Sequence, residues 1–405
     1  MPPCVSSLPR VAYFPDSFHE VNGVAHTSRH FEQYARRHGL PFLCIRAGDR
    51  SPALIREGPL WTLELPRGML SFALEKDLRF DPAYLRHIPV IADVLDEFAP
   101  TLVHITGPSE LGMLGAAVAA HHGLPLAASW HTNVHEYLAR RSDWLLRLLP
   151  QAAGRLLEEC TLAATAHFYS QAQVLFAPSH ALCEQLRSLT GRVCHRMPRG
   201  VDTELFRPDR RLRSRKAQPF TLGFVGRLSV EKNVALLASI HDQLLAQGQR
   251  NVRFVIVGHG AEEPQLRARM PESQFPGVLR GEALARAYAD MDLFVFPSHT
   301  DTFGNVVLEA LASGVPAIVT PDGGPAAILR DAMGSGAGPV GCICPDDGFA
   351  EAIQSLLRKP AERETLGANA RRYALGATWD AVFDGVYRGY AEALVGSEVP
   401  CALSA

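Results

Sequence analysis

The feature that most constrains the fold of this chain is an alternation of short apolar runs with amphipathic segments, which occurs in two series along its 405 residues. The short apolar runs indicate buried strands, and the segments between them have the apolar period of helices. Strands that alternate with helices favour a parallel sheet covered on both faces. We therefore expect an α/β fold with two such sheets.

The two series predict elements at definite positions. In the first series we expect strands at 11–14, 41–46, 102–105, 126–130 and 174–177, with helices at 26–38, 83–98, 112–122 and after the capping pair Pro178-Ser179. In the second we expect strands at 221–225, 252–257, 293–296 and 317–320, with helices from 234, around 264–269, at 306–313 and at 325–331. A final helix at 379–395 carries an aromatic stripe that is more typical of core than of a binding surface: Phe383, Tyr387 and Tyr390.

A polar, basic segment bounded by prolines separates the two series, R-P-D-R-R-L-R-S-R-K-A-Q-P at 207–219. It lacks the interleaved aromatics of a nucleic-acid site and is typical of an interdomain linker. We expect two Rossmann-like domains, 1–208 and 217–376, that face each other across a cleft at the carboxyl ends of their strands. The last helix, within 377–405, is expected to cross back to the first domain.

Composition and charge narrow the function classes. The hydrophobic fraction is 47% and the formal net charge is −2, so neither disorder nor nucleic-acid binding is indicated. The first ten residues do not resemble a secretory signal, and no apolar run is long enough to span a membrane. Eight scattered cysteines show no zinc-ligand spacing, and they fit reduced thiols in a cytoplasm. We expect a cytoplasmic protein with no structural metal.

The segment F-V-G-R-L-S-V-E-K-N, 224–233, suits an anionic ligand. An apolar strand ends at Gly226, where backbone can approach a ligand closely, and the following helix start offers unpaired amides to an anion. Arg227 supplies a rigid donor fork and Lys232 a mobile charge, a combination that fits a diphosphate. The alternative is a plain basic helix start in which Glu231 pairs with a neighbour.

The segment S-H-T-D-T-F-G-N-V-V-L-E-A-L-A-S-G-V-P, 298–316, places two carboxylates eight positions apart. If a helix starts near Asn305, Glu309 lies one turn inside it and Asp301 lies in the preceding loop. Carboxylates suit the paired hydroxyl donors of a vicinal diol. The alternative is that Asp301 or Thr302 caps the helix and that Glu309 is solvated.

Two further positions follow predicted strands of the first series. Gly23, in the loop D-S-F-H-E-V-N-G-V, would let backbone approach phosphates, although no G-x-G-x-x-G follows the first strand. That absence disfavours a nicotinamide oxidoreductase. His131, in S-W-H-T-N, is either a structural histidine or a residue that faces the predicted cleft.

In this order, these segments resemble the retaining glycosyltransferases of family 4. R-G-V-D-T-E-L-F-R-P at 199–208 resembles the family's interdomain segment, G-R-L-S-V-E-K its diphosphate-binding pattern, and D-T-F-G-N-V-V-L-E its E-x7-E motif. The resemblance covers nearly the whole chain. It implies the GT-B fold, with an acceptor-side N-terminal domain and a nucleotide-sugar-binding C-terminal domain.

The resemblance also implies roles for particular residues. Gly23, Arg227 and Lys232 would contact the donor diphosphate. Asp301 would hold hydroxyls of the transferred sugar, Glu309 the donor ribose, and His131 would lie beside the sugar on the acceptor side. Two further sets would complete the site, namely the backbone of Phe303, Gly304 and Asn305 at the sugar-phosphate pocket and Leu279-Arg280 at the base.

Two positions depart from the family pattern. Asp301 stands where the family usually has Glu, so its side chain is one methylene shorter. Arg199 stands where Asn is common, as in relatives that resemble mannosyltransferases acting on lipid carriers. The implied donor is GDP-mannose in preference to a UDP-sugar, and the acceptor is a lipid or a glycan.

We expect the reaction to proceed by front-face transfer without a metal or other cofactor. Arg227, Lys232 and helix amides would stabilise the charge that develops on the leaving diphosphate. The leucine- and arginine-rich segment 137–159 would either contact the inner face of the membrane or form a buried hairpin. The alternative functions are a sugar-nucleotide epimerase of the same fold and a non-catalytic two-domain sugar-binding protein.

Overall fold

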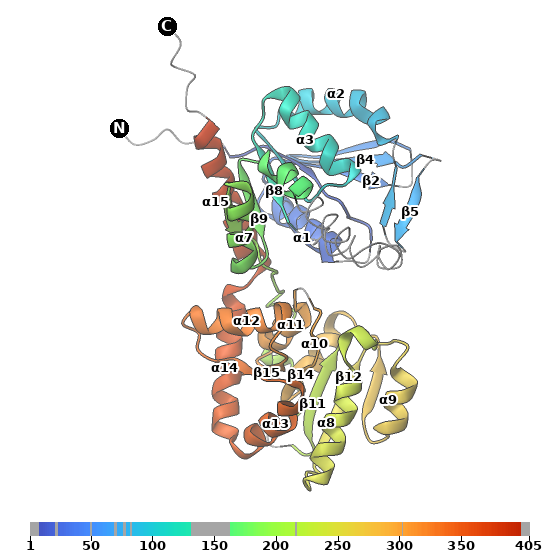
Figure 1. The fold of residues 1–405 in the computed structure, drawn as a ribbon, viewed down its shortest axis with the longest axis vertical. Helices are drawn as coiled ribbons and strands as arrows, with labels where there is room; N and C mark the ends of the chain where they lie inside the picture. The colour runs from blue at the N-terminus through green and yellow to red at the C-terminus, as the bar shows by residue number, and fades with distance from the viewer. Residues whose placement is uncertain are drawn as a thin grey trace, which may run out of the picture. The chain divides into compact units, whose positions relative to one another are not determined.

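The chain folds into two units, each with its own sheet and hydrophobic core (Figure 1). The computed structural model describes residues 8–20, 23–48, 51–68, 71–75, 78–81, 83–130, 163–214, 217–301 and 303–397. The first unit is Met1–Pro198 together with Val382–Ala405, and the second is Arg199–Ala381.

Over its described residues, the first unit contains an eight-stranded sheet of order β10-β9-β8-β7-β1-β2-β4-β3. Neighbouring strands run parallel except at the edge, where β3 is antiparallel to β4. A separate antiparallel pair is formed by β5 (Phe72–Glu75) and β6 (Leu78–Phe80). The strands of the main sheet are β1 (Val11–Phe14), β2 (Phe42–Gly48), β3 (Ala53–Glu57), β4 (Leu60–Pro66), β7 (Leu102–Ile105), β8 (Leu126–Ser129), β9 (Val174–Ala177) and β10 (Val193–Arg196).

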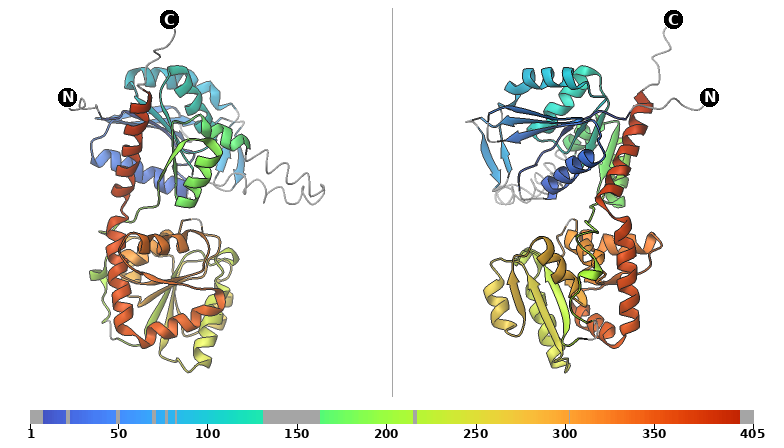
Figure 2. Two further views of the ribbon diagram at one scale, coloured as in Figure 1. Left: turned by 60° about the vertical axis from the view of Figure 1, so that its left-hand side comes forward. Right: turned by 180° about the vertical axis from the view of Figure 1, so that it is seen from behind.

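Helices cover both faces of this sheet, with α2 and α3 on one face and α1 on the other (Figure 2). Their bounds are α1 (Gly23–Arg37), α2 (Ile88–Phe98, after the 3-10 turn Tyr84–His87), α3 (Glu110–His122) and α7 (His180–Thr190). Ser179 caps α7 with its side chain, as the sequence predicts.

The C-terminal helix α15 (Trp379–Ser397) begins in the second unit and returns to the first. There the ring of Phe383 stacks on Phe31 of α1, with centroids 4.5 Å apart, and the Tyr34 hydroxyl donates to Asp384. Phe383 and Tyr390 are fully buried. The aromatic stripe of the last helix is therefore core, as its spacing predicts.

The second unit, described except at residues 215–216 and 302, contains a six-stranded parallel sheet of order β13-β12-β11-β14-β15-β16. Its strands are β11 (Phe220–Val225), β12 (Val252–Val257), β13 (Gln274–Gly277), β14 (Leu293–Phe296), β15 (Ala317–Val319) and β16 (Gly341–Ile343). Its other helices are α8 (Ala235–Ala246), α9 (Glu263–Arg269), α10 (Gly281–Ala289), α11 (Asn305–Ala312), α12 (Gly323–Gly334), α13 (Phe349–Arg358) and α14 (Pro360–Gly376), with 3-10 turns at Pro208–Arg210, Val230–Lys232 and Asp346–Gly348.

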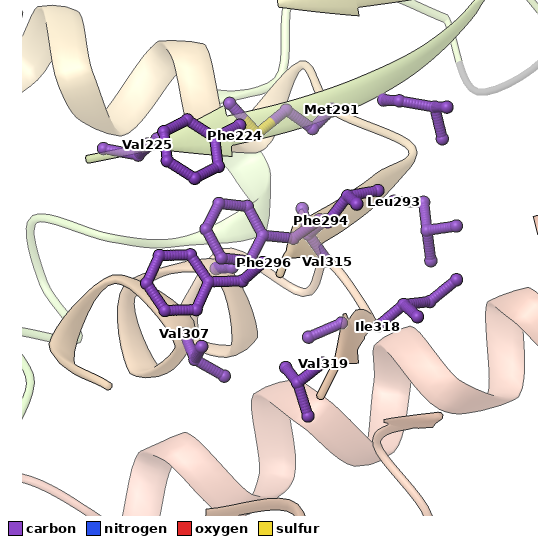
Figure 3. Close-up of a cluster of buried hydrophobic side chains, with 14 of the residues drawn as sticks. Phe224, Val225, Met291, Leu293, Phe294, Phe296, Val307, Val315, Ile318 and Val319 are labelled. Atoms are coloured by element: carbon purple, nitrogen blue, oxygen red, sulfur yellow. The ribbon is translucent and has the colours of Figure 1, made fainter. Parts of the chain in front are cut away.

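The core of the second unit is centred on the middle strands of its sheet. Phe224 of β11 stacks on Phe296 of β14, and Phe296 stacks on Phe294 of the same strand, at centroid distances of 5.8 and 6.0 Å (Figure 3). All three rings are essentially inaccessible to solvent. Every residue of β11 and β14 is buried, so both faces of these strands are covered, which explains why they are predominantly apolar in the sequence.

The expected linker at 207–219 is built into the second unit, and the division between the units falls before it, at Pro198. Arg211 donates to the carbonyls of Ala289 and Met291 and pairs with Asp292 at 2.5 Å. The basic segment is therefore anchored at the start of β14. The basic composition of this segment predicted that its side chains are solvated. An arginine guanidinium can instead donate its hydrogen bonds to backbone carbonyls and a carboxylate of the protein.

None of the helices in the described part of the chain combines the length and the apolarity needed to cross a membrane. The segment 137–159, for which we expect either membrane contact or a buried hairpin, lies outside the described residues.

Candidate functional site

The charged residues singled out in the second unit follow its central strands. Arg227 and Lys232 come after β11, and Asp301 comes after β14. These strands are neighbours in a parallel sheet, so both loops lie at its carboxyl edge. The chain leaves β11 toward β12 on one side and leaves β14 toward β15 on the other. The site is thus at the topological switch point, where open α/β sheets bind ligands.

Glycines allow the loops at this edge to pack closely. A Cβ on Gly258, which follows β12 and has a positive φ of 140°, would stand 1.9 Å from the Gly226 carbonyl oxygen. The Leu228 amide donates to the His259 carbonyl at 3.0 Å. The loop after β11 is therefore fixed by its neighbour, and only glycine permits that approach.

The two cations of this loop differ in environment. Arg227 is largely exposed and lies 3.7 Å from Glu231, which is the pairing that the plain helix-start interpretation predicts. The Lys232 side chain is only 20% exposed, and its Nζ lies 2.9 Å from Oδ2 of Asp301. Lys232 and Asp301 are 69 positions apart in sequence, and this ion pair joins the two loops of the switch point.

Asp301 also organises the loop that leads into α11. Its Oδ1 accepts from the amides of Phe303 and Gly304 at 3.1 and 2.9 Å. Burial by itself would raise the pKa of Asp301, but the Lys232 ammonium and these two amides hold it below its ordinary value. Asp301 therefore acts in part as the capping residue of our alternative interpretation, although the residue directly before α11 is Gly304, in left-handed conformation with φ 68°.

A buried arginine lies against the same loop. The guanidinium of Arg199 lies 3.9 Å from the centre of the Phe303 ring, and Arg199 is 5% exposed. A cation over an aromatic face in a desolvated site contributes about 2 kcal/mol. The departure from the family pattern at position 199 thus falls on a residue that touches the Asp301 loop.

Glu309 lies one turn inside α11, as expected, but it is partly buried and hydrogen-bonded. Its Oε2 accepts a hydrogen bond of 2.8 Å from the Tyr288 hydroxyl. Burial raises the pKa of Glu309 to about 7, and the Tyr288 hydroxyl opposes that rise. The interpretation of Glu309 as a solvated surface residue is therefore wrong.

His299 ties further loops of this edge together. Its Nδ1 lies 2.7 Å from Asp322, which precedes α12, and its Nε2 lies 2.9 Å from Asp346, which follows β16. The hydrogen bond with Asp322 raises the pKa of His299, and Asp346 adds to that effect against the opposing effect of burial. Because both ring nitrogens face carboxylates, this geometry suits the protonated imidazolium.

Comparison with known proteins identifies the family. Residues 19–205 match the model for Glycosyltransferase Family 4, and residues 219–359 match that for Glycosyl transferases group 1. The chain is 35% identical to a GDP-mannose-dependent alpha-mannosyltransferase of Mycolicibacterium smegmatis over 76% of this chain and 77% of that protein. It is 32% identical to the protein of the same name from Mycobacterium tuberculosis, over 96% and 97% of the two chains.

The chain belongs to glycosyltransferase family 4. Its fold also resembles that of sucrose-phosphate synthase from Thermosynechococcus elongatus, with a TM-score of 0.68, 19% identity, and coverage of 95% of this chain and 99% of the other. The GT-B fold expected from the sequence is confirmed. This family 4 glycosyltransferase is a retaining enzyme that uses a nucleotide-sugar donor.

The remaining predicted residues of the glycosyltransferase are distributed over both units. Leu279 packs against the core of the second unit, and the exposed Arg280 directly precedes α10. Gly23 is the first residue of α1 and belongs to the first unit. His131 lies outside the described residues.

Sequence reasoning missed Tyr288, which is 21 positions from Glu309 and carries no motif signal. It also missed Asp16 at the switch point of the first sheet, between β1 and β7. Asp16 accepts from the Ser109 hydroxyl at 2.5 Å, and its amide donates to Thr106. Burial raises its pKa to about 6 against these hydrogen bonds. The available signal was a carboxylate two residues after the end of the first strand.

Proposed function

We propose that this glycosyltransferase moves mannose from GDP-mannose to a lipid or glycan acceptor with retention of configuration. The observation that carries the proposal is the Lys232–Asp301 ion pair at the switch point of the second sheet, which joins a phosphate-binding cation to a hydroxyl-binding carboxylate. The two relatives named GDP-mannose-dependent alpha-mannosyltransferase support the choice of donor.

The donor diphosphate is held by Arg227 and Lys232 of the second unit. The exposed guanidinium of Arg227 is weakly paired, at 3.7 Å from Glu231, and is accessible to an anion. Lys232 is directed by Asp301, so its charge is placed before the donor arrives. Leu279 and Arg280, which directly precede α10, contact the base of the donor nucleotide.

The sugar and ribose are held by the loop and first turns of α11. Oδ2 of Asp301 retains a lone pair beside Lys232 for a sugar hydroxyl. The backbone of Phe303, Gly304 and Asn305 lines the sugar-phosphate pocket. Because the amides of Phe303 and Gly304 donate to Asp301, the first amides of α11 are the donors left for the phosphate. Glu309 accepts from the ribose hydroxyls. The Asp301 side chain is one methylene shorter than the Glu that the family usually has here. Two hydrogen bonds from backbone amides fix the position of its carboxylate.

Transfer follows a front-face path. The acceptor oxygen forms a bond to the anomeric carbon as the bond from that carbon to the β-phosphate oxygen breaks, and the acceptor proton passes to that diphosphate. Arg227 and Lys232 stabilise the negative charge that develops on the leaving diphosphate, without a metal.

The first unit supplies the acceptor side. Asp16 and Ser109 meet across the switch point of its sheet, where a ligand is expected in this class of fold. A carboxylate of this kind can hold an acceptor hydroxyl. The segment 137–159 is the candidate for contact with a membrane that carries a lipid acceptor.

A ligand screen by thermal unfolding tests the donor assignment. GDP-mannose, UDP-glucose and ADP-glucose are compared over a concentration series, with the corresponding free sugars as controls. We expect stabilisation by GDP-mannose of about 2.7 kcal/mol at a hundred times its Kd. Stabilisation by UDP-glucose without any by GDP-mannose would overturn the choice of donor.

A further inference from the structure

Tyr288 is a buried side chain whose hydroxyl contacts Glu309. It lies on α10 and is inaccessible to solvent, whereas Glu309 lies on α11 and is partly exposed. The hydroxyl donates to Oε2 of Glu309 at 2.8 Å, and within the described residues Oε1 of Glu309 has no hydrogen-bond partner. One carboxylate oxygen is thus held by the protein, and the other is available to a ligand.

Packing fixes the direction of this hydroxyl. The Tyr288 ring meets Phe206 edge-on, at 84° and 5.6 Å between centroids, and lies 5.6 Å from Phe294 of β14 at a tilt of 51°. Phe206 belongs to the 199–208 segment that resembles the family's interdomain segment. A tyrosine ring packed on two sides has little rotational freedom, so its hydroxyl is a preset donor.

The surroundings of Glu309 make that donor important. Burial raises the pKa of Glu309, and the Tyr288 hydroxyl opposes that rise; no charged side chain of the described residues contributes to the shift. A partly buried carboxylate without a cationic neighbour is stabilised mainly by its hydrogen bonds. Removal of the hydroxyl should therefore change both the orientation and the charge of Glu309.

We propose that Tyr288 is a positioning residue that holds Oε2 of Glu309 so that Oε1 faces the vicinal hydroxyls of the donor ribose. The inference rests on the proposed function, which assigns Glu309 to the ribose. It adds a residue outside every sequence motif of the site.

The test measures binding of GDP and UDP, each beside its 2′,3′-dideoxy form, to wild type and Tyr288→Phe. We expect Tyr288→Phe to weaken the better-bound natural nucleotide by about 10- to 100-fold, as is typical for the loss of a hydrogen bond to a charged group. Its dideoxy form should bind wild type and variant equally. The control is Tyr84→Phe, which removes a buried hydroxyl hydrogen-bonded to Leu65 in the first unit and should leave nucleotide binding unchanged.

The pH dependence gives a second readout. Ionised Glu309 accepts from the ribose, so this part of the affinity is lost as pH falls through its pKa of about 7. Without the Tyr288 hydroxyl that pKa is higher, so in Tyr288→Phe the loss should begin at higher pH. The dideoxy nucleotide carries the same titrating phosphates but lacks the ribose hydroxyls. The difference in affinity between the natural and the dideoxy nucleotide therefore does not contain the effect of phosphate titration.

The outcomes separate this inference from the proposed function. If Glu309→Gln weakens the natural nucleotide but Tyr288→Phe does not, the inference is wrong and the ribose assignment stands. If Glu309→Gln has no effect, the ribose assignment fails and the inference fails with it. An equal loss for natural and dideoxy nucleotides in Tyr288→Phe would show a general packing role and would also overturn the inference.

Discussion

Replacement of Lys232 by alanine is expected to lower kcat/KM for the nucleotide sugar by about 10²–10³-fold, the usual effect of removing a group that stabilises a developing anion. The structure supplies the reason for choosing Lys232. Its Nζ is held at 2.9 Å from Asp301 and its side chain is mostly buried, so the position of its charge is fixed. Arg227, at 72% exposure, is less constrained.

The loss should appear mainly in kcat, because charge on the diphosphate grows as the sugar departs. Initial rates over a range of donor concentrations measure it. The matched control is Lys359→Ala, which removes an exposed lysine paired with Glu362 and should leave the rate unchanged. A Lys232→Ala enzyme that keeps kcat/KM within a few-fold of wild type would exclude Lys232 from leaving-group stabilisation.

Acidification from about pH 7 to about pH 5 is expected to remove about 2 kcal/mol of unfolding free energy through His104 alone. His104 is a fully buried residue of β7 that meets the Tyr390 hydroxyl and the Ser129 hydroxyl. Burial lowers its pKa from 6.5 to about 3. Below about pH 6.5, His104 is therefore protonated in the unfolded chain but stays neutral in the folded chain. The free energy of unfolding falls as pH falls.

The comparison uses His104→Gln, whose amide can still bond both hydroxyls but does not titrate. Chemical unfolding across this pH range should show a difference between variant and wild type that shrinks by about 2 kcal/mol at the acidic end. Other titrating groups, such as Asp16, contribute equally to the unfolding free energies of variant and wild type, so their contributions cancel in the difference. His122→Gln, at an exposed position on α3, is the control and should follow wild type. Parallel pH profiles for His104→Gln and wild type would contradict a neutral buried His104.

The central strands were predictable because their sequence signal is strong. Strands β1, β7, β9 and β14 have the expected bounds, and every residue in them is buried. Three of them appear as continuous apolar runs, and β7 as an apolar run interrupted by His104. The edge strands have no such signal. In β3 four of the five residues are exposed, and β13 is the short sequence Gln-Phe-Pro-Gly. Strands of this kind form because a neighbour offers a free edge, which the local sequence does not record.

The candidate site was predictable where its residues lie within one loop. The loop position of Asp301 and the helical position of Glu309 both follow from a helix start near Asn305, which the structure has. The contacts between distant segments were not predictable. Lys232 and Asp301, or Asp16 and Ser109, meet only because parallel strands bring their loops to the same edge. The partner of each side chain depends on strand order, which no single motif encodes.

The most direct test of the central claim follows isotope-labelled mannose from GDP-mannose into product, with membrane lipids and short glycans offered as acceptors. NMR of the product reports the anomeric configuration, and GDP release is measured in parallel. We predict an α-linked mannoside formed in step with GDP, and its loss in Lys232→Ala. A β-linked product, or transfer from a UDP-sugar but not from GDP-mannose, would contradict the account.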